Sequence, residues 1–178
     1  GSGNVTISGS LFITGSRISL DDGKNNIAIG KSAGASITTG TQNTILGANA
    51  FDAAAVGESD NVAIGKNAMG AVDEGTAGGD IDKNIAIGTY ALFGGDFAGN
   101  DRQLQGNIAI GHQALDEIGT GTSTGAIAIG TYSQGNMTAD GANTSLGDNS
   151  CASLVTGVTN TALGYHTLRA AGAGESNN

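Results

Sequence analysis

The stretch Asn84-Ile85-Ala86-Ile87-Gly88 decides the fold, because close copies of it recur along most of the chain. Seven further segments align with it, and the eight motifs start at 26, 43, 61, 84, 107, 126, 143 and 160. Successive motif glycines are separated by 17, 18, 23, 23, 19, 17 and 17 residues, by subtraction. A short motif that returns at such intervals predicts a stacked repeat architecture.

The motif has the pattern of one short β-strand. The residue after the asparagine and the residue before the glycine share one face, and the alanine between them points to the other, into a space that admits only a small side chain. Glycine suits a corner where φ is positive or another backbone approaches closely. Three and four residues after the glycine stand a small and then commonly a larger apolar residue, such as Ala91 and Leu92. We expect a second short strand there, running back.

Each repeat is therefore predicted to be one two-stranded coil with a loop of variable length. Stacked asparagines are expected to form a ladder of side-chain amides and to support the turn before each strand. The predicted structural residues of the repeat are Asn26, Gly30, Asn43, Gly47, Asn61, Gly65, Asn84, Gly88, Asn107, Gly111, Gly130, Asn143, Gly147, Asn160 and Gly164.

The composition agrees with a thin, stacked core and excludes several functions. Glycine supplies 32 of 178 residues, far above its usual share of about 7%. Coils of this kind bury their apolar faces against their neighbours above and below. The net charge is −9 and the seven basic residues are scattered, which argues against nucleic acid and against an anionic membrane surface. No apolar run reaches about 18 residues, so we expect no membrane insertion.

Two regions follow from the position of the repeats. Residues 1–24 lack the motif and are predicted to be an N-terminal strand, cap or lead-in segment. Residues 25–178 form the predicted array of about eight coils. Asn178 lies 18 residues after Asn160, where a ninth motif would begin, so we expect the array to be truncated at that end.

Strands of the form Asn-Ile-Ala-Ile-Gly, each followed by x-x-Ala-Leu and a loop rich in Gly and Thr, resemble two related groups of proteins over residues 25–178. One is the repeat region of bacteriophage tail fibres and other virion appendages, and the other is the head domain of bacterial trimeric autotransporter adhesins. The resemblance implies a left-handed parallel β-roll and a homotrimer. The longer coils between Asn61 and Ala126, and the segment Gly3 to Ser16, favour the phage group.

We therefore expect an all-β, parallel β-solenoid that serves as a structural fibre segment of a virion and contributes to attachment to host-surface glycans. The alternative is an adhesin head at the bacterial cell surface. A more distant alternative is an ice- or surface-binding solenoid, which needs a flat array of threonines, whereas the threonines here fall in loops of unequal length.

No catalytic motif is present, so we expect no enzyme activity, cofactor or metal site. His112 and His166 stand at different positions after their motif glycines and three coils apart, which disfavours a shared metal ion.

Candidate ligand-binding side chains gather in a column two residues after the motif glycine. Tyrosine, glutamine and histidine there have the chemistry to stack on carbohydrate and hydrogen-bond to it, and two phenylalanines lie in the long loop that follows Ala91. The alternatives are that the column is only the solvent-facing side of a strand and that the phenylalanines fold their loop against the rod. The candidates are Tyr90, Phe93, Phe97, Gln113, Tyr132 and His166.

Overall fold

The computed structural model of the protein describes residues 23–53, 57–72, 80–94, 103–118, 122–135 and 142–169. These residues are all-β and contain no helix. Each motif forms a three-residue strand between its first residue and its glycine, as predicted. The motif strands are β1 Ile27–Ile29, β2 Thr44–Leu46, β3 Val62–Ile64, β5 Ile85–Ile87, β7 Ile108–Ile110, β9 Ile127–Ile129, β10 Thr144–Leu146 and β11 Thr161–Leu163.

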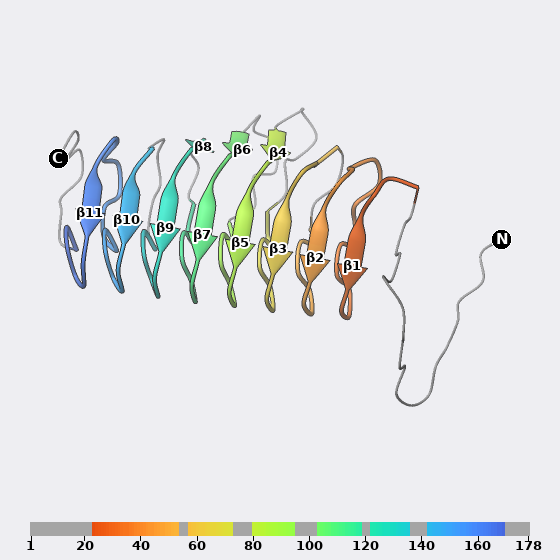
Figure 1. The fold of residues 1–178 in the computed structure, drawn as a ribbon, viewed down its shortest axis with the longest axis horizontal. Coiled ribbons are helices and arrows are strands. Elements are labelled where there is room, and N and C mark those ends of the chain that lie inside the picture. The colour runs from red at the N-terminus through yellow and green to blue at the C-terminus, as the bar shows by residue number, and fades with distance from the viewer. Residues whose placement is uncertain are drawn as a thin grey trace, which may run out of the picture.

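The motif strands pair in parallel and in register, so the described chain winds as a parallel β-solenoid (Figure 1). Their order in the eight-stranded sheet is β1-β2-β3-β5-β7-β9-β10-β11. Within each pair the motif positions face their equivalents, so that Ile85 lies opposite Ile108 and Ala86 opposite Ala109. The predicted N-terminal segment, residues 1–24, lies almost wholly outside the described residues.

A second parallel sheet precedes the motif strands in three of the longer coils. It consists of β4 (Asp80–Asp82), β6 (Gln103–Gln105) and β8 (Ser123–Thr124), in that order. Only the central residues of β4 and β6, Ile81 and Leu104, are buried within those strands. The sequence repeat did not predict this sheet, because it lies in the part of each coil that varies.

The predicted second strand after each motif glycine is wrong: the described residues there form turns. The second and fourth residues after the glycine adopt positive φ, as in Tyr90 (58°) and Leu92 (47°). Because every second residue has a positive φ, the backbone of this segment cannot form an extended strand. The backbone is still paired from coil to coil, because the Leu92 amide donates to the Ala114 carbonyl at 2.9 Å.

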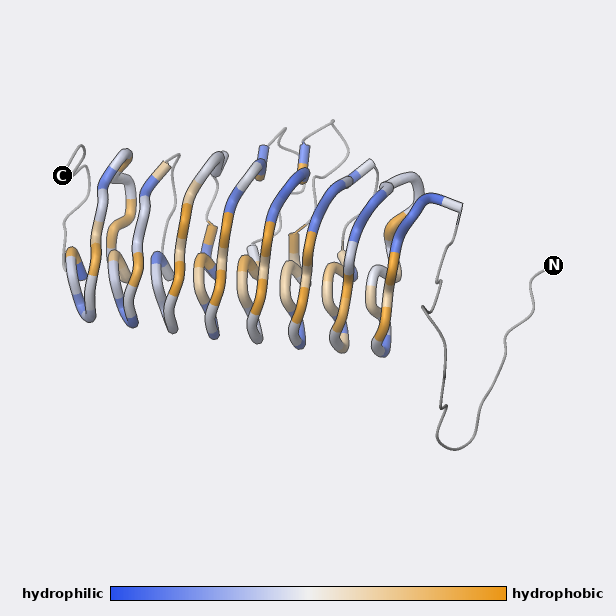
Figure 2. Tube along the Cα trace, viewed as in Figure 1, coloured by the Kyte–Doolittle hydropathy of each residue, from blue (hydrophilic) through white to orange (hydrophobic). Residues whose placement is uncertain are grey.

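The core lies between the motif strands and these turns. The middle residue of each motif strand from β2 to β11 is buried, and in most of these strands it is alanine, which confirms that this side of the strand admits small side chains. The residues four positions after the glycine, such as Phe51, Met69, Leu92 and Leu115, fill the interior behind them. Figure 2 shows hydrophobic residues in bands along the motif strands and in stretches of the turns that follow them.

Two exceptions to the repeat compensate for each other. Gly34 stands where other coils carry a large residue, and Ile45 stands where other strands carry alanine. A Cβ placed on Gly34 would meet Cδ1 of Ile45 at 2.8 Å. The isoleucine of one coil therefore fills the space that the preceding coil leaves empty. Gln134 and Ser145 form a second exceptional pair, joined by a hydrogen bond of 2.9 Å from Nε2 to Oγ.

This compensation predicts coupled stability effects. Gly34→Leu alone should lower the free energy of unfolding by about 1–3 kcal/mol through overpacking. Ile45→Ala alone should lower it by about 2 kcal/mol by opening a cavity. The double variant carries the residue types found in neighbouring coils. Its free energy of unfolding should be at least about 1 kcal/mol higher than the value expected if the two losses simply added. Urea unfolding of all four proteins measures this, and additive losses would contradict the pairing.

The predicted asparagine ladder is present in the described coils. The Oδ1 atom of Asn84 accepts the backbone amide and the Nδ2 of Asn107, both at 3.0 Å. Its Nδ2 donates to the Leu104 carbonyl, three residues before the next motif, at 2.6 Å. Each rung thus connects two coils and supports the turn before a strand. At Ala126 the missing side chain is replaced by Ser123, whose Oγ donates to Asn107 Oδ1 at 3.1 Å.

Candidate functional site

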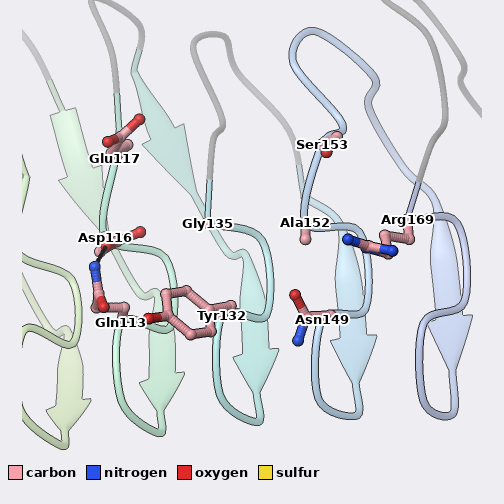
Figure 3. Close-up of a pocket in the computed structure, with 9 residues that line it drawn as sticks. All are labelled: Gln113, Asp116, Glu117, Tyr132, Gly135, Asn149, Ala152, Ser153 and Arg169. Atoms are coloured by element: carbon pink, nitrogen blue, oxygen red, sulfur yellow. Dashed lines mark hydrogen bonds between the residues drawn. The ribbon is translucent and has the colours of Figure 1, made fainter.

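Two open cavities adjoin each other on the turns that follow the motif strands. The first has a volume of about 320 Å³ (Figure 3) and is lined by Gln113, Asp116, Glu117, Tyr132, Gly135, Asn149, Ala152, Ser153 and Arg169. The second has a volume of about 370 Å³ and is lined by Tyr90, Phe93, Gly94, Gln113, Asp116 and Glu117. They share the last three residues of the second group, so they form a single depression.

The solenoid brings these side chains together because equivalent turns stack. Tyr90, Gln113, Tyr132 and Asn149 all stand two residues after a motif glycine, following β5, β7, β9 and β10. All four adopt φ between 52° and 58°, so the same turn presents each of them in the same way. The predicted column therefore exists, and these four of its members line the cavities.

A buried carboxyl group lies where the cavities meet. Asp116 is only 9% exposed, and Gln113 donates to its Oδ2 from Nε2 at 2.7 Å. Burial raises the pKa of the Asp116 carboxyl above its ordinary value of 3.8, and the hydrogen bond from Gln113 opposes that shift. Glu117 beside it is exposed. The pair of carboxyl groups thus combines a fixed acceptor with a solvated one.

Aromatic rings stand on either side of this carboxyl group. Tyr90 and Phe93 meet edge to face with ring centroids 5.0 Å apart. Tyr132, which is 41% exposed, meets the His112 ring edge to face at 5.6 Å. Such contacts orient the rings while leaving a face for a ligand.

The other predicted site residues are not brought to these cavities. His166 belongs to the column, but its ring is stacked on Tyr165 at 3.8 Å and lines neither cavity. Phe97 lies outside the described residues. Within the described ranges no group of three or more His, Cys, Asp or Glu side chains is placed to hold a metal ion. The same part of the chain contains no helix long and apolar enough to cross a membrane.

Sequence reasoning missed Asp116, Glu117 and Arg169. A signal for two of them exists: Phe93, Asp116 and Arg169 all stand five residues after a motif glycine, in a second column beside the first. A comparison of the coils that extended past the fourth residue after the motif glycine would have found this second column.

Because the Asp116 carboxyl is buried, we expect the stability difference between the wild type and Asp116→Asn to depend on pH. Because its folded-state pKa is raised, the folded protein holds the proton more tightly, and stability falls as the pH rises from 3.8 to the raised value. Asp116→Asn keeps an acceptor for Gln113 and removes the charge. We expect the variant to melt above the wild type at pH 7 and the gap to close as the pH falls through that window. Calorimetry at several pH values measures this, and a gap of constant size would contradict it.

Comparisons with known proteins return nothing. No family model matches the chain, and neither a curated protein sequence nor a solved structure matches it.

Proposed function

We propose that this chain is a structural segment of a bacteriophage fibre or other virion appendage, that it assembles as a homotrimer of left-handed eight-coil solenoids, and that it contributes to attachment to host-surface glycans. The parallel solenoid of the described residues is compatible with such a rod. The observation that carries the proposal is an apolar strand face that points away from the core.

That outer face is made by the first and third residues of each motif strand. These sixteen positions hold thirteen Ile, Val or Leu residues and three Thr residues. Ile29 is 49% exposed, Leu46 46% and Leu163 71%. The residues adjoin one another, because paired strands lie about 4.8 Å apart. Rows of exposed apolar side chains that adjoin one another in this way mark interaction surfaces.

Further copies of the same chain are the partner we propose for this face. A second copy carries the same residues at the same spacing, so each coil can meet an equivalent coil, as symmetric oligomers require. Covering the face would also remove exposed Ile and Leu side chains of a thin repeat from water. The number of three comes from the resemblance to trimeric β-rolls.

A single charge on the outer face tests this assembly. Ile87→Lys leaves the interior unchanged, because Ile87, the last residue of β5, lies on the strand face opposite to the buried Ala86. In the assembly the lysine would be buried without a partner, which costs several kcal/mol per subunit. We expect its mass in sedimentation to fall to that of one chain, while the far-ultraviolet circular dichroism is retained.

Lys66→Ala, at an exposed position outside the strand face, is the matched control and should keep the assembled mass. An Ile87→Lys variant that sediments like the wild type would rule out this face as the interface.

The location of the protein is tested by electron microscopy with a gold-labelled antibody against the chain. We expect label on an appendage of virus particles. Label on bacterial cells that carry no particles would replace the proposal with the adhesin alternative.

A further inference from the structure

We propose that the two adjoining cavities form one groove that binds an extended, uncharged oligosaccharide lying along the stack of coils. This inference deepens the attachment role proposed above and rests on it. The groove takes residues from the turns after β5, β7, β9, β10 and β11, so it crosses five consecutive coils.

The length of the groove suits a chain of sugar rings. Five coils at a strand spacing of about 4.8 Å span roughly 19 Å between the first and the last. A pyranose in an extended glycan advances by a length comparable to one strand spacing, so successive rings meet successive coils. A column of equivalent turns thus offers repeated contacts to a repeating ligand.

The side chains supply the two contacts that sugars need. The exposed ring of Tyr132 and the ring of Tyr90 offer apolar surfaces for the C–H faces of a pyranose. The amides of Gln113 and Asn149 donate and accept hydrogen bonds, and the carboxylates between the rings accept them from pairs of hydroxyl groups. Asp116 is held in place by Gln113 at 2.7 Å, so its acceptor is fixed before a ligand arrives.

The carboxylates of the groove discriminate between neutral and acidic sugars. Asp116 and Glu117 line both cavities, whereas Arg169 lines only the first, at its far end on the last of the described coils. The whole chain carries a net charge of −9. A glycan with carboxylate, sulfate or phosphate groups would meet like charges at the centre of the groove. The groove therefore favours neutral sugars over acidic ones.

The groove and the proposed assembly face are separate. None of the residues that line either cavity belongs to a motif strand. Loss of one function therefore need not remove the other, and the two proposals can be tested on the same sample.

The test is calorimetric titration of the assembled wild-type protein with neutral hexasaccharides (maltohexaose, cellohexaose and the hexamer of N-acetylglucosamine) and with the acidic hexamer of galacturonic acid. We expect at least one neutral sugar to bind and the acidic one to bind at least tenfold more weakly. Tyr132→Ala should weaken the binding about fivefold or more by removing a stacking ring. Asp116→Asn should weaken it about tenfold by removing a charged acceptor.

Tyr165→Ala is the matched control, because Tyr165 is 69% exposed and lines neither cavity, and it should bind like the wild type. Failure of every neutral sugar to bind at millimolar concentration, equal or tighter binding of the acidic hexamer, or full affinity in both groove variants would overturn the proposal. Sedimentation of the same samples separates the two proposals. If the protein is assembled but binds no sugar, only the proposed groove is contradicted. If the protein is a monomer, the proposed assembly is contradicted.

Discussion

Replacing Gly88 with alanine is expected to lower the free energy of unfolding by about 4 kcal/mol or more, which is among the largest effects of a single substitution. Gly88 has a φ of 135°, a conformation that residues with a side chain rarely adopt. A Cβ there would lie 2.4 Å from the carbonyl oxygen of Gly111 in the next coil. Because the obstacle is backbone, relief requires two coils to separate and weakens the hydrogen bonds between β5 and β7.

Gly106→Ala is the control for this prediction. Gly106 also has a positive φ, 66°, but a Cβ there would meet nothing within 4 Å. Lys83 occupies the same position in the preceding coil with a φ of 61°. We expect a loss of about 1 kcal/mol, the ordinary penalty of a left-handed residue. Urea unfolding compares the two variants, and equal losses would show that close stacking of the motif glycines does not hold the coils.

Asn84→Ala is expected to destabilise the protein by about 3–5 kcal/mol through the loss of one rung of the ladder. The backbone amide of Asn107 loses its acceptor, and its Nδ2 keeps only the Ser123 carbonyl. The Leu104 carbonyl loses the Nδ2 of Asn84, and the Oδ1 of Asn61 loses the same donor. Each buried polar group left without a partner costs about 1–3 kcal/mol. The alanine at position 126 is tolerated because Ser123 takes over part of this bonding; the corresponding residue before Asn84 is Ile81, which has no side-chain donor.

Asn149→Ala provides the same chemical change outside the ladder. The side chain of Asn149 donates to the exposed carboxylate of Asp148 and makes no ladder contact. We expect a loss below about 1 kcal/mol from its left-handed backbone. Thermal unfolding followed by circular dichroism measures both variants. A loss at Asn84 no larger than that at Asn149 would mean that the ladder adds nothing to stability.

The repeat in the sequence was enough to predict the motif strands, their buried small residue, the glycine corner and the asparagine ladder. Each of these features depends on a residue type with one dominant structural role, as glycine has at Gly88 and asparagine at Asn84. The second strand was predicted wrongly because Tyr90 and Leu92 carry no signal for positive φ; their conformation is imposed by hydrogen bonds to neighbouring coils. The sheet β4-β6-β8 was missed because its strands lie in loops of unequal length.

The candidate site was predictable in part for a similar reason. The column with Tyr90, Gln113 and Tyr132 follows from counting along the repeat, and these side chains do line the cavities. Asp116 was missed because the comparison of coils stopped at the fourth residue after the motif glycine. Its position could have been counted from the repeat, but its burial depends on how adjacent turns pack. The compensation between Gly34 and Ile45 was also visible in the sequence only as two unrelated exceptions.

In the proposed assembly, two other copies of the chain cover the outward apolar face of the motif strands. The most direct test of this assembly is the mass of the purified protein in solution, measured by light scattering during size-exclusion chromatography. One chain has a mass of 17.3 kDa, so a homotrimer should have three times that value, about 52 kDa. A well-folded particle of 17.3 kDa that keeps its β-sheet circular dichroism would contradict it.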